Sequence, residues 1–417
     1  MEKQKTMNRA MVVTGAILIQ LALGAIYAWS VFTPSLKDAG WSKTDTQWVF
    51  SVGLLSFSLA MIFAGKKLNS WGPRKLAVIG GITLGMGYIL AGVTGGTDFY
   101  SLLIFIGLIG GAGIGFAYVV PIAVGMRWFP DKKGMITGLA VAGFGFGAML
   151  WVKLAGAWGE LIDTVGLSNT FIIYGVIFAL MVITGGIWMR FPPKGWQPEG
   201  YAAGGEHAEV SGTRELDSKQ MLRTPQFYLI FFTFVFSAGA GLMAIGIMKL
   251  YPMEALTANG ITKSQASAIA GTAMAVFFSL ANGLGRILWG IISDKIGRKT
   301  SIIIMTASQG ILMILFPYMA GNQWLLYLGA ALTGFNFGGN FALFPTITAD
   351  TFGTKTVGQN YPYVFLAYGV GGILGPVLAG YLGDMGNFPL AFVISGIAVL
   401  TGTLLISLVK PVGQSTG

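Results

Sequence analysis

Arg286 is the residue of this chain with the clearest capacity for chemistry. It lies in an apolar segment, from about Ala266 to Ile292, that is long enough to span a bilayer and contains no carboxylate. An arginine near the centre of a membrane helix costs about 2.5–3.5 kcal/mol on insertion scales, so it is expected to face the protein interior and to meet an anion. Asn282 lies one helical turn earlier on the same face. The pair predicts an anion site in which a neutral amide stands beside a guanidinium fork.

Arg286 and Lys153 both lie in apolar segments, and for each the charged group could either reach the membrane interface or stay inside the protein. The long side chain of Arg286 could extend to the membrane interface and bind lipid phosphate there. The neighbouring glycines, Gly283 and Gly285, and the basic cluster Lys295–Lys299 that already marks the interface, favour a deeper position. Lys153, near the end of its own segment, could extend outward in the same way, or could attract anions into an outward-facing vestibule.

The composition is that of a polytopic membrane protein. Of 417 residues, 54% are hydrophobic and only 10% are charged, with a mean hydropathy of +0.70, whereas a soluble domain carries about 25% charged residues. The chain has no cysteine and one histidine, His207, so disulfides and thiolate or histidine metal clusters are excluded. All 16 acidic residues are expected in loops or at span ends, which argues against a cation site or a relay of buried carboxylates.

Twelve apolar runs of about 20 residues or more predict twelve membrane-spanning helices. They begin near Ala10, Trp48, Leu76, Tyr100, Gly134 and Thr170, and again near Phe227, Ala266, Ser301, Trp324, Val357 and Pro389. Between these sets of six, a stretch rich in proline and charge is expected to form a linker. The predicted organisation is an N-terminal half over residues 1–190, a linker over 191–226 and a C-terminal half over 227–417.

Positive charge is distributed unevenly between the loops. The side that holds both termini and the linker carries 20 of the 26 lysine and arginine residues, and the other side carries four. Because positively charged loops stay in the cytoplasm, both termini and the linker are expected there. The net charge of +10 therefore reflects membrane orientation, and no nucleic-acid partner is expected.

An internal repeat relates the two sets of spans. Gly65–Lys75 follows the second span and Gly290–Lys299 follows the eighth, with two glycines seven residues apart in each copy and an offset of 225 residues between copies. Two six-helix halves with equivalent basic loops indicate parallel repeats related by an axis along the membrane normal.

The second copy resembles the loop motif of the major facilitator superfamily, whose aspartate–arginine contacts hold the cytoplasmic ends of helices together. Asp294 and Arg298 match it, whereas the first copy has Asn69 in place of the acid, with Arg74 following, so its charge gate is expected to be weaker. Further stretches resemble the oxalate/formate antiporter family, which is close to the monocarboxylate transporters: Gly24–Phe32, Arg127–Gly134, Phe337–Pro345 and Ala367–Gly372.

This resemblance bears on the substrate and on the coupling ion. Animal monocarboxylate transporters are similar around Arg286 but have an aspartate where this chain has Asn282, so a carboxylate proton carrier is absent here. The oxalate antiporter has a second cation, a lysine, where this chain has Tyr368. One buried cation neutralises one carboxylate and an unpaired buried charge is costly. A monocarboxylate is therefore expected rather than a dicarboxylate.

Neutral polar and aromatic residues are expected to line the rest of the site. Tyr118 resembles a family tyrosine near the substrate, and with Asn282 it is the foremost candidate contact. For each single aromatic residue, ordinary helix packing is an equal alternative. The other candidates share helix faces with one another: Tyr27 in the first span, Phe337, Asn340 and Phe341 in the tenth, and Phe365 and Tyr368 in the eleventh.

The expected function is secondary transport of a small monocarboxylate such as lactate or pyruvate, by alternating access and with proton symport. The protein is expected to be a monomer in the inner membrane without a cofactor. A carboxylate exchanger of the oxalate/formate type is the alternative, and a carboxylate receptor is a third. An enzyme is not expected, because no nucleophile–base set is visible.

The run Gly143–Gly147 lies in a span without a following Lys-Ser, so it is interpreted as a close helix contact and not a nucleotide loop.

Overall fold

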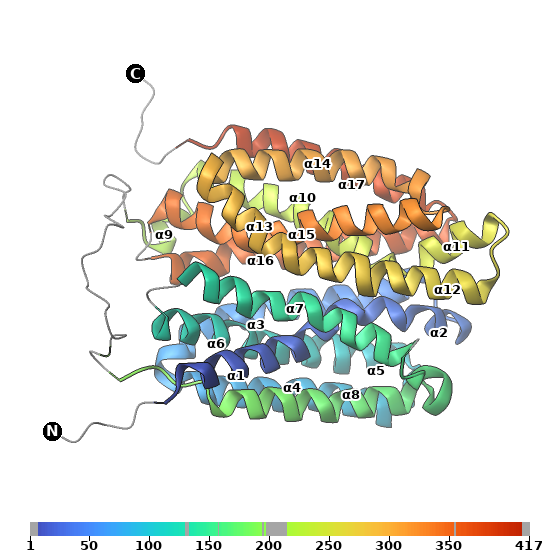
Figure 1. The fold of residues 1–417 in the computed structure, drawn as a ribbon, viewed down its shortest axis with the longest axis horizontal. Coiled ribbons are helices and arrows are strands. Elements are labelled where there is room, and N and C mark those ends of the chain that lie inside the picture. The colour runs from blue at the N-terminus through green and yellow to red at the C-terminus, as the bar shows by residue number, and fades with distance from the viewer. Residues whose placement is uncertain are drawn as a thin grey trace.

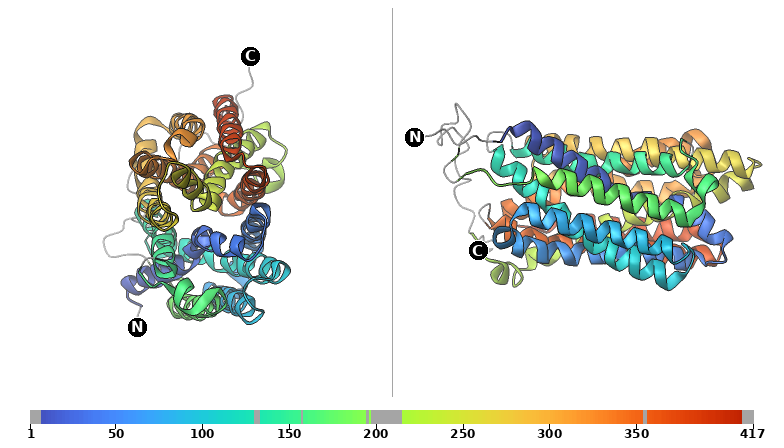
Figure 2. Two further views of the ribbon diagram at one scale, coloured as in Figure 1. Left: turned by 90° about the vertical axis from the view of Figure 1, so that its right-hand side faces the viewer. Right: turned by 90° about the horizontal axis from the view of Figure 1, so that it is seen from below.

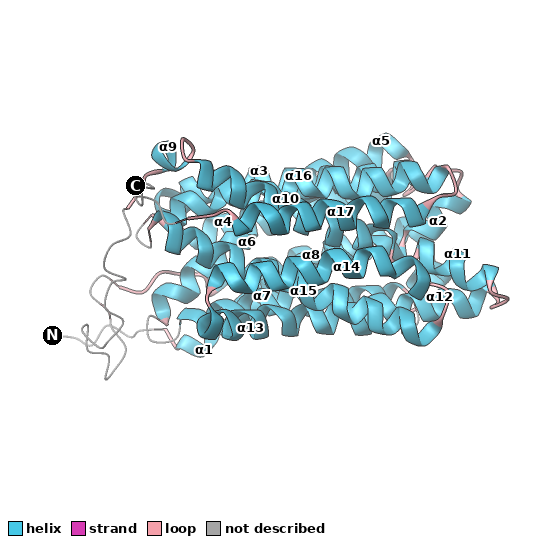
Figure 3. Ribbon diagram, turned by 90° about the horizontal axis from the view of Figure 1, so that it is seen from above, coloured by secondary structure: helices cyan, strands magenta, loops and turns pink. Residues whose placement is uncertain are grey.

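A computed structural model describes residues 7–129, 133–156, 158–193, 196, 215–353 and 356–410, and every regular element in them is a helix. The long helices run side by side along the longest axis of the molecule (Figures 1 and 3).

The first group of long helices contains six units. They are α1 with its 3₁₀ continuation η1 (Arg9–Leu23, Gly24–Val31), α3 (Lys43–Trp71), α4 (Pro73–Val93), the continuous α5, η2 and α6 (Phe99–Leu102, Leu103–Gly110, Gly111–Trp128), α7 (Lys133–Ala155) and α8 (Leu161–Ile187). The short α2 (Thr33–Asp38) connects the first two units.

The second group also contains six units. They are α10 (Pro225–Ile247), the continuous α12, η3 and α13 (Lys263–Thr272, Ala273–Phe278, Ser279–Ile296), α14 (Arg298–Met319), α15 (Gln323–Phe352), α16 (Val357–Asp384) and α17 (Phe388–Ser407). The short α9 (Ser218–Met221) and α11 (Leu250–Ala258) flank α10. Ten of the twelve units are long and apolar enough to cross a membrane. The prediction of a twelve-helix, all-α membrane protein is confirmed.

Seen along the bundle axis, the units form two neighbouring groups (Figure 2). We call α1–α8 the N-terminal group and α10–α17 the C-terminal group. One end of the bundle, the linker end, is where α1 begins, α9 lies and α17 ends; the far end holds α2, α5 and α11 (Figures 1 and 3). The boundaries of the two halves stay a prediction, and most of the linker, including His207, lies outside the described residues.

The internal repeat is visible in the backbone. Gly72 has φ 82° and ψ 150°, and Gly297, its counterpart, has φ 88° and ψ 152°. Both lie in the left-handed region that favours glycine, and each ends one long helix immediately before the next begins. The same residue spacing therefore makes the same turn in both groups.

The two groups are joined at the far end by polar contacts. Asp384, at the end of α16, accepts the backbone N–H groups of Lys43 and Thr44 at 2.6 and 2.9 Å and the Thr44 hydroxyl at 2.6 Å. These N–H groups begin α3, where they have no acceptor within the helix and where the helix dipole attracts a carboxylate. Lys43 Nζ also pairs with Glu254 of α11 at 2.6 Å.

Two further contacts join the groups deeper in the bundle. Gln47 Nε2 donates to the backbone oxygen of Gly246 at 3.3 Å. Lys153 is only 9% exposed and its Nζ donates to Thr272 Oγ1 at 3.2 Å. The alternative in which Lys153 extends outward is therefore wrong, because its amine points into the boundary between the groups.

Candidate functional site

Arg286 lies on α13 at the boundary between the two groups and is 2% exposed. Its Nε donates to Asn282 Oδ1 at 3.2 Å, one turn earlier. Within the described residues, Nη1 and Nη2 of Arg286 and Nδ2 of Asn282 have no hydrogen-bond partner, and no carboxylate forms an ion pair with Arg286. The deep position is confirmed, because a side chain reaching the membrane interface would be exposed.

A close crossing of α13 and α15 fixes this pair. A Cβ added at Gly338 would lie 2.2 Å from the backbone oxygen of Asn282 and 3.0 Å from its Oδ1. A Cβ at Gly285 would lie 2.1 Å from the backbone oxygen of Phe335. Small residues allow such close backbone contact in membrane helices, so these glycines set the position of the amide and guanidinium groups.

We expect Gly338→Ala to lower the thermal unfolding temperature of the detergent-purified protein and to weaken transport. The added methyl group must push α13 and α15 apart, and overpacking of this kind costs about 1–3 kcal/mol. Gly290→Ala, on α13, is the matched control, since its Cβ would lie 3.9 Å from the Ala342 Cβ, an ordinary contact. Equal unfolding temperatures for the two variants would contradict the close crossing.

Four tyrosines gather around the guanidinium group. Tyr27 of η1 and Tyr118 of α6 come from the N-terminal group, and Tyr361 and Tyr368 come from α16 of the C-terminal group. The charge of Arg286 acts on all four hydroxyls. The Tyr368 hydroxyl donates to that of Tyr27 at 3.0 Å, so a hydrogen bond joins the two groups beside the cation.

Phe341 of α15 stacks against the cation. The Arg286 Cζ lies 4.0 Å from the centroid of its ring, in cation–π geometry. Phe337 lies 5.3 Å from the same ring and Phe365 of α16 lies 6.3 Å from it. The sequence-predicted phenylalanines of these two helices are therefore brought together around the Phe341 ring, which contacts the guanidinium group.

Asn340 does not join this cluster through its amide. The Ser237 hydroxyl of α10 donates to its Oδ1 at 2.8 Å, and its Nδ2 donates to the backbone oxygen of Phe337 at 3.1 Å. These contacts tie α15 to α10 inside the C-terminal group. Its expected role as a substrate contact has no support from this geometry.

Sequence reasoning missed two aromatic residues of the N-terminal group. Phe57 of α3 lies 5.0 Å from the Tyr118 ring, and Phe144 of α7 lies 5.0 Å from the Tyr27 ring and 5.8 Å from the Arg286 Cζ. Phe144 belongs to the run Gly143–Gly147, whose glycines were a signal for close approach. Phe57 stands in an apolar run without such a signal.

The interpretation of that glycine run is confirmed. A Cβ at Gly145 would lie 3.2 Å from the backbone nitrogen of Gly283, and one at Gly283 would lie 2.9 Å from the Phe146 ring. Thus α7 of the N-terminal group crosses α13 of the C-terminal group close to Asn282.

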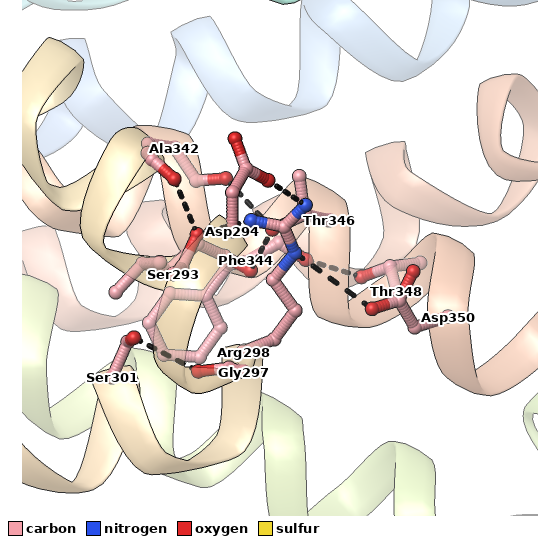
Figure 4. Close-up of polar contacts among 12 residues, drawn as sticks. Ser293, Asp294, Gly297, Arg298, Ser301, Ala342, Phe344, Thr346, Thr348 and Asp350 are labelled. Carbon is pink, nitrogen blue, oxygen red and sulfur yellow. Dashed lines mark hydrogen bonds and ion pairs between the residues drawn. The ribbon is translucent and has the colours of Figure 1, made fainter. Parts of the chain in front are cut away.

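The loop motif forms an ionic cluster at the linker end (Figure 4). Arg298, the first residue of α14, pairs with Asp294 of α13 at 2.5 Å and lies 3.8 Å from Asp350 of α15. It also donates to the hydroxyl of Ser293. One guanidinium group thus ties three helix ends together, as the motif predicts.

The first copy uses a different donor. Asn69 Oδ1 accepts a hydrogen bond from Arg127 Nη2, at the end of α6, at 2.9 Å. Arg74, which the sequence grouped with Asn69, is exposed. The contact in this copy joins a neutral amide to a cation, and among the described residues no ion pair involves Asn69, Arg74 or Arg127. The weaker charge gate expected there stays a prediction.

The central arrangement can bind a small anion with a short apolar part. The two terminal nitrogens of Arg286 match the two oxygens of a carboxylate, and hydroxyl groups and aromatic rings from both groups surround them. Within the described residues, no cluster of three metal-ligating side chains is present.

Comparison with known proteins agrees with this architecture. The family model described as Major Facilitator Superfamily matches residues 14–257 and 230–416. The chain is 31% identical to the MFS-type transporter YhjX of Escherichia coli over 88% of this chain and 86% of the relative. It is 27% identical to the oxalate:formate antiporter of Oxalobacter formigenes over 96% and 90%, and 24% identical to monocarboxylate transporter 13 of Rattus norvegicus over 93% and 86%.

Proposed function

The chain belongs to the major facilitator superfamily, and on this basis we propose that it is a secondary transporter of small monocarboxylates of the lactate and pyruvate type. Two of the relatives are named for carboxylates, an oxalate:formate antiporter and a monocarboxylate transporter. The buried anion site at Arg286 is the feature of this chain that a carboxylate substrate would use.

The observation that carries the proposal is that Arg286 is 2% exposed and that, within the described residues, neither of its terminal nitrogens has a hydrogen-bond partner. A buried charge without a partner is costly, and a charge-assisted bidentate contact with a carboxylate removes that cost. Asn282 Nδ2 supplies a further donor. Tyr27 and Tyr118 supply hydroxyls, and Phe341 packs on the short apolar part of the acid.

The charge of the site favours a monocarboxylate. Tyr368 is neutral and is hydrogen-bonded to Tyr27, so among the described residues that surround the site Arg286 is the single cation that would face the substrate. A monocarboxylate balances that charge, whereas a dicarboxylate would bring a second negative charge without a cation to meet it.

Proton symport is the proposed coupling. Inward movement of an anion against a negative interior needs a compensating charge. Within the described residues no carboxylate pairs with Arg286, so the proton travels on the substrate itself, shared with a hydroxyl or water as its contact with Arg286 loosens.

Alternating access is the proposed cycle, with the linker end in the cytoplasm. The site lies between two groups of helices that would rock around it. Asp384 and the Lys43–Glu254 pair join the two groups at the far end, and we take these contacts to belong to the state in which the far end is closed. The far end then opens to the outside when these contacts break.

Uptake of labelled lactate, oxalate and formate into proteoliposomes tests the proposal. An inward proton gradient should drive accumulation of lactate, and a protonophore should abolish it. If uptake ignores the gradient but depends on carboxylate loaded inside the vesicles, the protein is an exchanger, the second candidate, which the similarity to the oxalate:formate antiporter favours.

Substrate charge can be tested at one position. We expect Tyr368→Lys to weaken lactate transport and to create oxalate binding, because it places a second cation beside Arg286 and removes the hydrogen bond to Tyr27. Tyr368→Phe is the matched control, which removes the hydroxyl without adding charge. Lactate transport at the normal rate without oxalate binding in Tyr368→Lys would place Tyr368 outside the site.

A further inference from the structure

Two lysines meet at the boundary between the groups, on the far-end side of Arg286. Lys153 comes from the end of α7 and Lys249 from the junction of α10 and α11. Lys153 Nζ donates to Thr272 Oγ1 at 3.2 Å, and Lys249 Nζ donates to the backbone oxygen of Ser267 at 2.7 Å. A Cβ at Gly271, the neighbour of Thr272, would lie 3.3 Å from Lys249 Nζ. The two ammonium groups therefore lie against the same stretch of α12.

This lysine pair holds two like charges close together in a partly buried place. Lys153 is 9% exposed and Lys249 is partly buried. Within the described residues neither forms an ion pair, and the charges of Lys153 and of the exposed Asp163 on α8 act on Lys249 in opposite directions. Each ammonium group has three donors. An anion placed between them would accept hydrogen bonds from both and remove their repulsion.

We propose that Lys153 and Lys249 form a second anion site, which binds the carboxylate of the substrate at the far-end mouth before it reaches Arg286. This inference rests on the proposed function for the identity of the anion. α12, η3 and α13 form one continuous unit that carries Thr272 near the lysine pair and Arg286 at the central site. Fourteen helical residues span about 21 Å, so the two sites are separate and a small acid cannot contact both.

The lysine pair also joins the two groups, because Lys153 belongs to the N-terminal group and Lys249 to the C-terminal group. An anion held between them offsets the repulsion that opposes closure of the far end. Binding at this site therefore favours the closed far end that the structure shows.

The protonation of Lys249 sets the pH range of the site. Burial, with a further contribution from the charge of Lys153 and against that of Asp163, lowers the pKa of Lys249 to about 8. The amine is charged below that pH and neutral above it, and only the charged form attracts an anion. Affinity for carboxylate at the lysine pair should therefore fall as the pH rises through about 8, and bound anion should raise this pKa.

Saturation-transfer NMR of the lactate methyl protons, with purified protein in detergent, separates the two sites. In Arg286→Ala the central site is removed, and we expect a lactate signal to persist. Adding Lys153→Gln and Lys249→Gln should abolish that signal, and Lys153→Arg with Lys249→Arg should keep it. Loss of the signal in Arg286→Ala alone, or its persistence in the triple variant, would overturn the second site.

Transport kinetics test the site in the protein with Arg286 intact. Lys153→Gln or Lys249→Gln should raise the KM for lactate offered at the far end about fivefold, the effect of one charge pair at about 4 Å in water. The salt dependence of KM should weaken in parallel. Lys263→Gln is the control. This exposed lysine is also on α12, but its partner is Asp38, at 3.8 Å, and it does not belong to the lysine pair. An unchanged KM in both glutamine variants would overturn the site. Failure of the proposed function would look different, since the unaltered protein would then take up no lactate.

Discussion

Replacing Arg286 with lysine is expected to reduce carboxylate uptake at least about tenfold, the effect of about 1.4 kcal/mol at the site. Lysine keeps the charge but loses the planar fork that holds two carboxylate oxygens at once. It also loses the stacking of the guanidinium group on Phe341 at 4.0 Å. Initial rates of lactate uptake into proteoliposomes, at matched protein density, measure the effect.

Two further variants define what this result means. Arg286→Ala should abolish uptake, and retained uptake in that variant would remove Arg286 from the site. Arg223→Lys makes the same chemical change at an exposed position at the linker end, and its uptake should equal that of the unaltered protein. Size-exclusion chromatography in detergent checks that each variant is folded.

Replacing Asp384 with alanine is expected to open the far end. Asp384 accepts three hydrogen bonds from Lys43 and Thr44, and a hydrogen bond to a charged group contributes about 1.5–3 kcal/mol. Loss of even one shifts the balance between closed and open states about tenfold. Transport should slow as well, because the cycle must pass through the state with a closed far end.

A single introduced thiol reports this opening, since the chain has no cysteine of its own. Ser51→Cys is nearly isosteric, and Ser51 is fully buried on α3, one turn from Gln47 at the same boundary. Its labelling by a water-soluble maleimide should be about tenfold faster in Asp384→Ala. Asp38→Ala is the matched control: Asp38 is exposed and lies 3.8 Å from Lys263, so its loss should leave labelling unchanged. Equal labelling in both variants would show that Asp384 does not hold the far end shut.

The sequence predicted those features that depend on local pattern. Apolar runs located the twelve helical units, and the glycine spacing of the repeat located two equivalent turns at Gly72 and Gly297. The unpaired arginine with an amide one turn earlier located the centre of the site, because a helix places Asn282 and Arg286 on one face whatever surrounds it.

Features that depend on contact between distant helices could not be predicted in the same way. Phe57 and Phe144 are ordinary apolar residues within their own spans, and only the packing of α3 and α7 against the C-terminal group brings them near Tyr27 and Tyr118. Asp384 looks like any acid at a span end until the start of α3 is placed beside it. The acceptor role of Asn69 also required the position of Arg127, 58 residues later.

The meeting of Gly145 and Gly283 has a mechanical consequence. Here two helices from different groups approach closely at residues without side chains, with 3.2 Å between the Gly283 nitrogen and a Cβ placed on Gly145. The neighbouring side chain at this contact is the Phe146 ring of α7, 2.9 Å from a Cβ placed on Gly283. Such a surface allows sliding, which is the shear type of domain motion. A movement of this kind would carry α7 past Asn282, whereas the close crossing of α13 with α15 at Gly338 and Gly285 would hold the guanidinium group in its orientation. The glycine pair thus provides a helix contact suited to sliding beside the binding site.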